Sequence, residues 1–293
     1  MFILLSLLIA LGAGWQESFS RGQNIAPAYE GWERNADGSF NLVFGYFNRN
    51  WDEEIDVPIG PMNSFEAAPP GGREGIDQGQ PTHFLPRRNR FVFKIRVPSD
   101  FGEREIVWTL TTHGKTERAY ASLRPDYFID DAVIMANNGA AGMGGSNPTL
   151  KGNKPPVLKV DGETTRHVKI GQPIALTAVA TDDGIPRPRR MPPMVAGRAT
   201  RFTVDSATGL RLSWFVYRGK GSVVFDPVQT KVWEDTRDNA NSPWSYGWRT
   251  PRVPPEGKWN VSATFREPGT YVLRCLAHDG GLMTSQDVTF VVE

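Results

Sequence analysis

The sequence predicts an all-β protein built from two β-sandwich domains. The first observation is composition: the 293 residues include 30 glycines and 23 prolines, which favour many turns between short strands. The second is the alternation in RFVFKIRVP, where Phe91, Phe93, Ile95 and Val97 would face a core and the charged residues solvent. The third is length, because a chain of this size can hold two ordinary domains, each with its own core.

The composition also excludes several classes of protein. The net charge of +1 gives no reason to expect nucleic acid or an anionic membrane surface as the main partner. Aromatic residues make up 11% of the chain, which is enough for real cores and excludes a disordered chain.

The chain begins with the apolar run MFILLSLLIALGAG, residues 1–14, followed by polar residues. This pattern is typical of a secretory signal peptide, and it is too short for a spanning helix of about 20 apolar residues. We therefore expect no transmembrane segment beyond the signal peptide, and a secreted, periplasmic or cell-surface location. The single cysteine, Cys275, cannot form a disulfide within the chain, so it is either a buried apolar residue or an intermolecular thiol.

The first domain is expected over residues 15–125. Its strand candidates include YEGWER, SFNLVFGYFN, RFVFKIRVP, REIVWTLTTHG and KTERAYASL, and the last two are joined through His113 and Gly114 as a hairpin. A Gly- and Pro-rich loop, residues 58–86, interrupts the strands and is too long for a tight turn. Residues 126–153 change character, and their second part is dominated by Gly, Asn and Ala, which predicts a linker.

The second domain is expected over residues 154–293. Seven short strand candidates with turn signals between them match the strand count of an immunoglobulin-like sandwich. These candidates are Val157–Val160, His167–Ile170, Ile174–Thr181, Leu210–Tyr217, Trp259–Phe265, Tyr271–Ala277 and Asp287–Val292. Two long loop insertions interrupt them, one rich in Pro and Arg and one aromatic in its middle.

Four stretches of this second half carry a family resemblance. PGTYVLRCLAHDGG with TSQDVTFVVE, IALTAVATDDG, GNKPPVLKV and LRLSWFVYRG resemble the strands of bacterial extracellular Ig-like modules of the PKD and cadherin-like type, over about residues 152–293. The resemblance implies a fold and no activity. Leu176 and Ala178 stand where a disulfide partner of Cys275 would lie, which favours the buried apolar role for that cysteine. Residues 15–125 resemble no family.

The same resemblance implies a calcium site. In cadherin-like domains, aspartates at two strand ends help to bind calcium, and the matching residues here are Asp182, Asp183 and Asp279. The predicted linker would bring Asp130 and Asp131 to the same pole of the sandwich. The alternative is that these aspartates only build turns, and the adjacent spacing of Asp182 and Asp183 favours it.

An aromatic loop is the main candidate for ligand binding. PWSYGWRTP carries Trp244, Tyr246 and Trp248 between prolines. Exposed aromatic side chains can stack on sugar rings or anchor a protein partner, and the alternative is that they extend the core.

Catalytic motifs are absent from the sequence. The four histidines lie in different segments, and there is no zinc-protease helix, nucleophile elbow or phosphate loop. Carboxylate pairs of the glycosidase kind are assembled in space and leave no sequence motif. Asp77 and His83, in the 58–86 loop, form the best candidate cluster for a hydrolase, and ordering of that loop is the alternative.

The sequence therefore predicts a secreted or cell-surface, non-enzymatic binding or structural module of a bacterium. Its expected partner is a protein or glycan at the cell surface, with calcium as the candidate cofactor and no role for nucleic acid. Two alternatives stay open: a carbohydrate-binding accessory protein that uses the Trp244–Trp248 loop, and a hydrolase with its site in the 58–86 loop.

Overall fold

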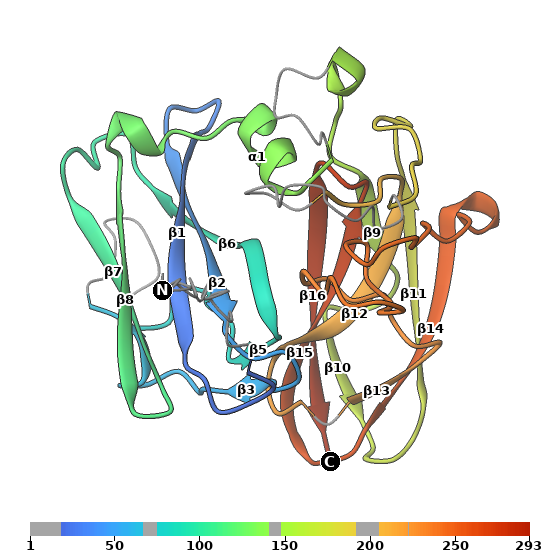
Figure 1. The fold of residues 1–293 in the computed structure, drawn as a ribbon. Helices are drawn as coiled ribbons and strands as arrows, with labels where there is room; N and C mark the ends of the chain where they lie inside the picture. The colour runs from blue at the N-terminus through green and yellow to red at the C-terminus, as the bar shows by residue number, and fades with distance from the viewer. Residues whose placement is uncertain (1–18, 67–74, 141–147, 192–204, 222) are drawn as a thin grey trace, which may run out of the picture.

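The computed structural model describes residues 19–66, 75–140, 148–191, 205–221 and 223–293. Their secondary structure is almost entirely β, which confirms the predicted fold class, and the strands form two sandwiches side by side (Figure 1). The predicted signal peptide, and the middle parts of the 58–86 loop and of the Pro- and Arg-rich insertion, lie outside the described residues. No helix within the described ranges is long and apolar enough to cross a bilayer.

The first sandwich packs two antiparallel sheets. One has the strand order β1 (Ile25–Arg34), β2 (Phe40–Asn48), β6 (Arg87–Val97), and the other β4 (Asn63–Phe65), β7 (Glu105–Thr112), β8 (Lys115–Ser122). A small pair, β3 (Ile55–Asp56) and β5 (His83–Phe84), extends one end.

The core of this sandwich is aromatic. The rings of Phe44 and Phe93 stack with centroids 5.2 Å apart, and Trp108 meets both edge-on. Because aromatic side chains bury the largest apolar areas, this cluster supplies much of the driving force for the small sheets. The predicted hairpin is confirmed: His113 and Gly114 both have positive φ, 48° and 71°, as a two-residue turn between β7 and β8 requires.

The predicted alternation in β6 is correct for Phe93, Ile95 and Val97, which are buried, and wrong for Phe91. The pairing of β2 with β6 shifts register next to Phe44, and Phe91 adopts a φ of 53°. This bulge turns Phe91 to the opposite face of the sheet, where it packs against the cluster between the sandwiches.

The segment predicted as a linker contains ordered structure. It comprises η1 (Pro125–Tyr127), α1 (Asp131–Asn137) and η2 (Pro148–Leu150). Ile134 and Met135 of α1 are buried, in one apolar cluster with Val43 of β2 and Leu282, which precedes β16. This cluster joins the two sandwiches at the end where the chain crosses between them.

The second sandwich also packs two four-stranded sheets. One has the order β10 (Thr165–Val168), β16 (Met283–Val292), β15 (Gly269–His278), β12 (Arg211–Arg218). The other has the order β13 (Val223–Asp226), β14 (Lys258–Phe265), β11 (Ile174–Thr181), β9 (Val157–Val160), and η3 (Pro255–Gly257) leads into β14. All seven predicted strands are present; β9 and β11 have the predicted bounds, the other five have shifted ends, and β13 was not predicted.

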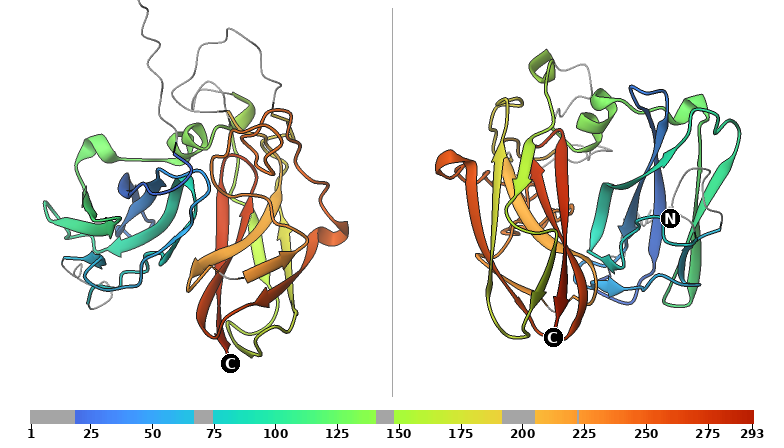
Figure 2. Two further views of the ribbon diagram at one scale, coloured as in Figure 1. Left: turned by 60° about the horizontal axis from the view of Figure 1, so that its bottom comes forward. Right: turned by 180° about the vertical axis from the view of Figure 1, so that it is seen from behind.

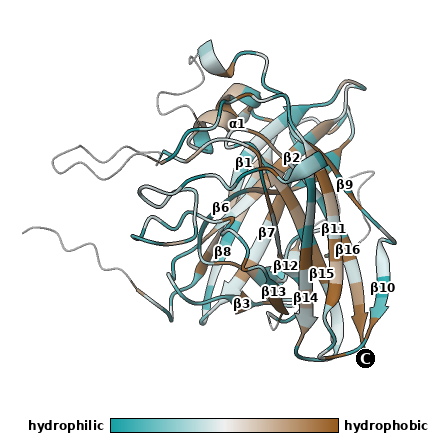
Figure 3. Ribbon diagram, turned by 90° about the vertical axis from the view of Figure 1, so that its right-hand side faces the viewer, coloured by the Kyte–Doolittle hydropathy of each residue, from teal (hydrophilic) through white to brown (hydrophobic). Residues whose placement is uncertain are grey.

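Apolar residues line the inside of this sandwich and polar residues its outer edges (Figure 3). Trp214 and Cys275 face each other across β12 and β15 and are almost fully buried. Cys275 is a free thiol, as its lack of a partner in the sequence predicts. This two-sheet core gives the second half its immunoglobulin-like architecture.

Candidate functional site between the sandwiches

The two sandwiches lie side by side (Figure 2). A cleft with a volume of about 1130 Å³ lies between them. One wall is β6 with neighbouring side chains of β1 and β2, and the other is the outer face of the β12–β15–β16 sheet. Strand periodicity explains the second wall. In β15, Leu273 and Cys275 point into the core, so Val272, Arg274 and Leu276 point into the cleft.

Arg274 connects the two walls. Its Nη1 donates a 2.5 Å hydrogen bond to the carbonyl oxygen of Val92 in β6. Its Nε and Nη2 pair with the carboxylate of Asp287 on β16, at 2.7 and 2.8 Å. The guanidinium also lies over the ring of Tyr217, 3.5 Å from the centroid. A planar, permanently charged group can satisfy three partners at once, which a lysine could not.

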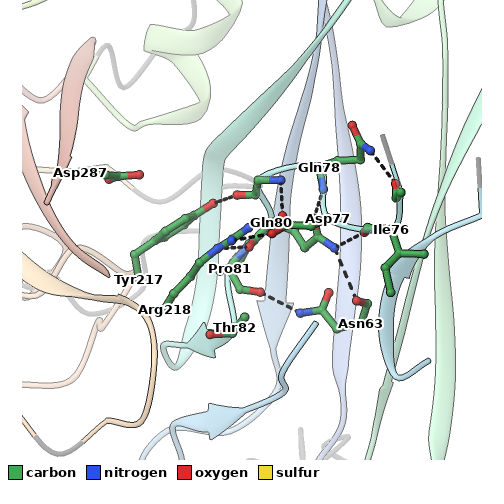
Figure 4. Close-up of polar contacts among 12 residues, drawn as sticks. Asn63, Ile76, Asp77, Gln78, Gln80, Pro81, Thr82, Tyr217, Arg218 and Asp287 are labelled. Atoms are coloured by element: carbon green, nitrogen blue, oxygen red, sulfur yellow. Dashed lines mark hydrogen bonds and ion pairs between the residues drawn. The ribbon is translucent and has the colours of Figure 1, made fainter. Parts of the chain in front are cut away.

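The 58–86 loop closes one end of the cleft by binding β12 of the second sandwich (Figure 4). Arg218 forms a two-pronged ion pair with Asp77, with N–O distances of 2.7 and 2.9 Å. Tyr217 donates through its hydroxyl to the carbonyl oxygen of Gly79 at 2.5 Å, and the Thr82 amide donates to the Tyr217 carbonyl. This part of the loop is therefore ordered by contacts with the other domain.

His83 is buried at the same end and lies between two carboxylates. Its Nδ1 is 2.7 Å from Asp56 and its Nε2 is 3.1 Å from Glu54. Burial alone would lower the pKa of His83, but the hydrogen bonds to Asp56 and Glu54 outweigh it and raise the pKa to about 9. Gly221 of the second sandwich packs on the ring, where an added Cβ would lie 2.7 Å from His83 Cε1.

The hydrolase candidates Asp77 and His83 therefore have separate partners. Asp77 pairs with Arg218, and His83 pairs with Asp56 and Glu54. A histidine whose pKa is about 9 is charged at neutral pH, and an imidazolium cannot act as a general base. The contacts of both residues match the alternative in which they order the loop.

The aromatic insertion of the second sandwich also contacts the first. Glu234 forms an ion pair with Arg90 of β6, with an N–O distance of 2.6 Å. Arg237 forms an ion pair with Asp52 at the same N–O distance. Arg237 is held by Asp235, whose carboxylate is buried. Burial raises the pKa of Asp235, but hydrogen bonds from Arg237 and Lys231 outweigh it and lower the pKa to about 2.

The three predicted aromatic residues lie in different surroundings. Trp244 is only 6% exposed and lines the cleft next to α1, whereas Tyr246 is 37% exposed. Trp248 is half-buried, and its indole nitrogen donates to Asn241 at 3.1 Å. Trp244 thus does not offer a face to solvent on which a sugar ring could stack.

The aspartates of the predicted calcium site form turns. Asp182 accepts from the Gly184 amide, and Asp183 accepts from the amides of Ile185 and Lys154. Asp279 is fully buried and accepts from two amides through Oδ1. Burial raises the pKa of Asp279 to about 6, partly offset by these hydrogen bonds.

These turns leave oxygen atoms unused. Asp182 Oδ1, Asp279 Oδ2 and Asn153 Oδ1 are buried and have no partner at full hydrogen-bond geometry. The three side chains are neighbours, because the Asn153 amide lies close enough to lower the pKa of Asp279 by hydrogen bonding and the charge of Asp182 raises it. Buried carboxylate oxygens without donors are rare in proteins because they are costly. No group of three or more His, Cys, Asp or Glu within the described ranges is placed to hold a metal ion, so any site depends on the amide of Asn153.

Asp130 and Asp131 have other contacts. Asp130 caps α1 by accepting from the Val133 amide at 2.9 Å. Asp131 lines the cleft, and burial, with the nearby charge of Glu33, raises its pKa. The interactions of both residues are thus with α1 and the first sandwich, and not with Asp182 or Asp279.

Sequence reasoning singled out Asp77, His83, Asp131 and Trp244 for other roles, but it missed the contacts that join the two walls of the cleft. Arg274 and Val92 are 182 positions apart, and Arg218 and Asp77 are 141 apart. Neither pair leaves a local pattern, so only the folded chain reveals them.

No model of a known protein family matches the chain, and no curated protein matches it. Solved structures give distant likenesses only. Domains 4 and 5 of the S-layer protein SbsC are 11% identical, covering 67% of each chain with a TM-score of 0.22. The Yersinia pseudotuberculosis adhesin InvE is 11% identical, covering 93% of this chain and 60% of that one, with a TM-score of 0.23.

The fibronectin(III)-like modules of Clostridium thermocellum CbhA are 8% identical, covering 90% of each chain, also with a TM-score of 0.23. Scores this low carry no argument about function, and they do not identify the PKD or cadherin-like type. The description of the fold therefore rests on the strands and sheets of this chain.

Proposed function

We propose that the protein is a non-enzymatic binding module that holds its ligand in the cleft between the two sandwiches. The observation that carries this proposal is a cleft of about 1130 Å³ whose two walls are tied together at both ends. This volume exceeds the range of about 300–1000 Å³ typical of small-molecule sites, so it suits a polymeric ligand. The apolar run at residues 1–14 supports export of the protein to a bacterial surface.

A variant whose cleft is filled by a large side chain tests the proposal. Ser285 is exposed on β16 and lines the cleft, so Ser285→Trp would fill it without touching the core. Val224→Trp, at an exposed position of β13 in the other sheet of the same sandwich, is the matched control. We expect wild type and the Val224 variant to cosediment with cell-wall preparations and their surface proteins, and the Ser285 variant to remain in solution. Equal sedimentation of all three would contradict a role for the cleft.

Glycan binding through the aromatic loop is the second candidate. Tyr246 and Trp248 retain exposed surface, whereas Trp244 is buried. A Trp248→Ala variant that no longer pellets with insoluble polysaccharide, while the Ser285→Trp variant still does, would favour the loop over the cleft.

We further propose that calcium binds where Asp182, Asp279 and Asn153 meet. The donor set is suitable, since calcium prefers carboxylate and amide oxygens, and the ion would satisfy three buried oxygens that have no partner at full hydrogen-bond geometry. Bound calcium would supply positive charge that holds the Asp182 turn to the strand end at Asp279.

Thermal unfolding in calcium and in EDTA tests this site. A ligand that binds only the folded state raises its stability, by about 2.7 kcal/mol at a concentration 100 times the dissociation constant. We expect Asp279→Asn to lose the response to calcium and Asp183→Asn to keep it, because both oxygens of Asp183 already accept amides. A wild-type midpoint that is the same in calcium and EDTA would contradict the proposal.

A further inference from the structure

One edge of β6 faces the cleft without a partner strand. β6 is the last strand in the order β1–β2–β6, and β2 occupies only its other edge. Consecutive residues from Arg88 to Arg96 line the cleft. Side chains alone would line it at every second position, so the continuous run means that the backbone itself borders the cleft.

The contact from Arg274 shows which backbone groups point outward. Arg274 binds the carbonyl oxygen of Val92 from the cleft side. In a trans peptide the next N–H points the opposite way, so the Phe93 amide points towards β2. Backbone groups then alternate along an antiparallel strand, which directs the N–H and C=O of Lys94 and Arg96 into the cleft. In the described part of the chain, no backbone hydrogen bond from outside the β2–β6 ladder reaches these four groups.

We propose that this edge binds an extended, acidic segment of a partner protein, which adds a fourth strand to the β1–β2–β6 sheet. The inference rests on the proposed function of the cleft and names its ligand class. In strand addition, backbone hydrogen bonds supply affinity and alternate side chains supply specificity. The opposite wall of the cleft prevents the β6 edge from pairing with the sheet of another molecule, which protects the protein from aggregation through this edge. The cleft still has room for a single strand.

Charge on the cleft walls selects the acidic segment. Six Arg and Lys side chains line the cleft against three acidic ones, and each of the six forms an ion pair; the cations are Arg88, Arg90, Lys94, Arg96, Arg218 and Arg274, and the acids are Glu33, Asp131 and Asp287. Lys94 and Arg96 are the most exposed of these cations, at 47% and 62%. Their ion pairs with Glu33 and Asp37 are on the surface, where such pairs contribute little, so an incoming carboxylate can replace them.

Register sets the spacing of the acids. Residues directly opposite each other on paired strands point to the same face of the sheet. A partner strand that places carboxylates opposite Lys94 and Arg96 therefore carries them two positions apart. The preferred ligand is an acid–x–acid segment with β-branched residues between and around the acids.

The test uses the synthetic peptide Thr-Val-Glu-Val-Glu-Val-Thr with the full protein. We expect binding by calorimetry, together with slowed deuterium exchange at the amides of Lys94 and Arg96 and not at those of Phe93 and Ile95. The same peptide with N-methylated glutamates loses backbone donors and should bind about tenfold more weakly, in line with the loss of one or two hydrogen bonds.

Two variants separate backbone pairing from charge. Lys94→Pro removes an amide that the alternation of the strand directs away from β2, and should weaken binding as N-methylation does. Lys94→Gln keeps the amide and should weaken binding less. Equal affinity for the N-methylated peptide, or absence of protection at residues 94 and 96, would overturn strand addition. If Ser285→Trp still abolishes sedimentation with cell-wall material in that case, the cleft function stands and the ligand is of another class, such as a glycan.

Discussion

Titration of His83 should make the stability of the protein fall as the pH rises from about 6 to about 10. The perturbation is deprotonation of a buried imidazolium held by Asp56 and Glu54. The pKa of His83 in the folded protein is about 9, above the value of 6.5 for a free histidine. A raised pKa means that the folded state binds the proton more tightly. The stabilisation is therefore fully present below pH 6.5 and is lost as the pH rises through 9.

The magnitude follows from the size of this rise. Each pH unit of difference between folded and unfolded pKa corresponds to about 1.4 kcal/mol, which gives an upper value of about 3 kcal/mol for His83. The carboxylates of Glu54 and Asp56 are 43% and 42% exposed, so solvent screening reduces the contribution. We expect a change of about 1–3 kcal/mol in the free energy of unfolding.

Urea unfolding at about pH 6 and at about pH 10 measures the effect. The quantity of interest is the difference in unfolding free energy between wild type and His83→Gln, which cancels the titration of other groups. His113→Gln is the matched control, because His113 is 38% exposed and pairs with a single acid, Glu53. The difference for His83 should shrink at high pH. A difference for His83 that is the same at both pH values would refute the reasoning.

Three further effects should be measurable. Arg274→Met should lower the unfolding free energy by about 2–4 kcal/mol in urea titrations, because it removes charge-assisted hydrogen bonds to Asp287 and Val92. A loss below about 0.5 kcal/mol would mean that Arg274 does not stabilise the contact between the two walls. Gly221→Ala should destabilise the protein by displacing the His83 ring, and calorimetry should show a lower melting temperature than for a Gly60→Ala control, since Gly60 has open space around its Cα and no positive φ. Cys275 should react with Ellman's reagent only after unfolding, because burial raises the pKa of its thiol; rapid reaction in the folded protein would instead support an intermolecular thiol.

Sequence reasoning predicted what depends on local periodicity. The strands of the second sandwich follow from alternating apolar residues, and the turn at His113 and Gly114 from residues that tolerate positive φ. α1 was hidden because its seven residues lie in a Gly- and Asn-rich segment, although Asp130 supplies an N-cap signal. β13 has only four residues before Pro227, too few to show alternation.

The candidate site could not be predicted in the same way. Its walls are the outer faces of two sheets, where sequence patterns show only that a residue is polar. Lys94 and Arg96 are typical of a solvated strand face, and nothing in their spacing shows that a second sandwich lies opposite. Whether a strand is central or at an edge is likewise a property of the sheet and not of the strand's own residues.

The attachments at the two ends of the cleft have a kinetic consequence. The apolar cluster around α1 holds one end of the cleft, and the contacts of Tyr217 and Arg218 with the 77–82 segment hold the other (Figure 1). Two domains that are attached at both ends of the cleft cannot close on a ligand by rotation about a single hinge. A ligand would instead enter from an open side and meet a surface already in its final shape. Association should then follow one concentration-dependent phase, and differences between ligands should lie mainly in their dissociation rates.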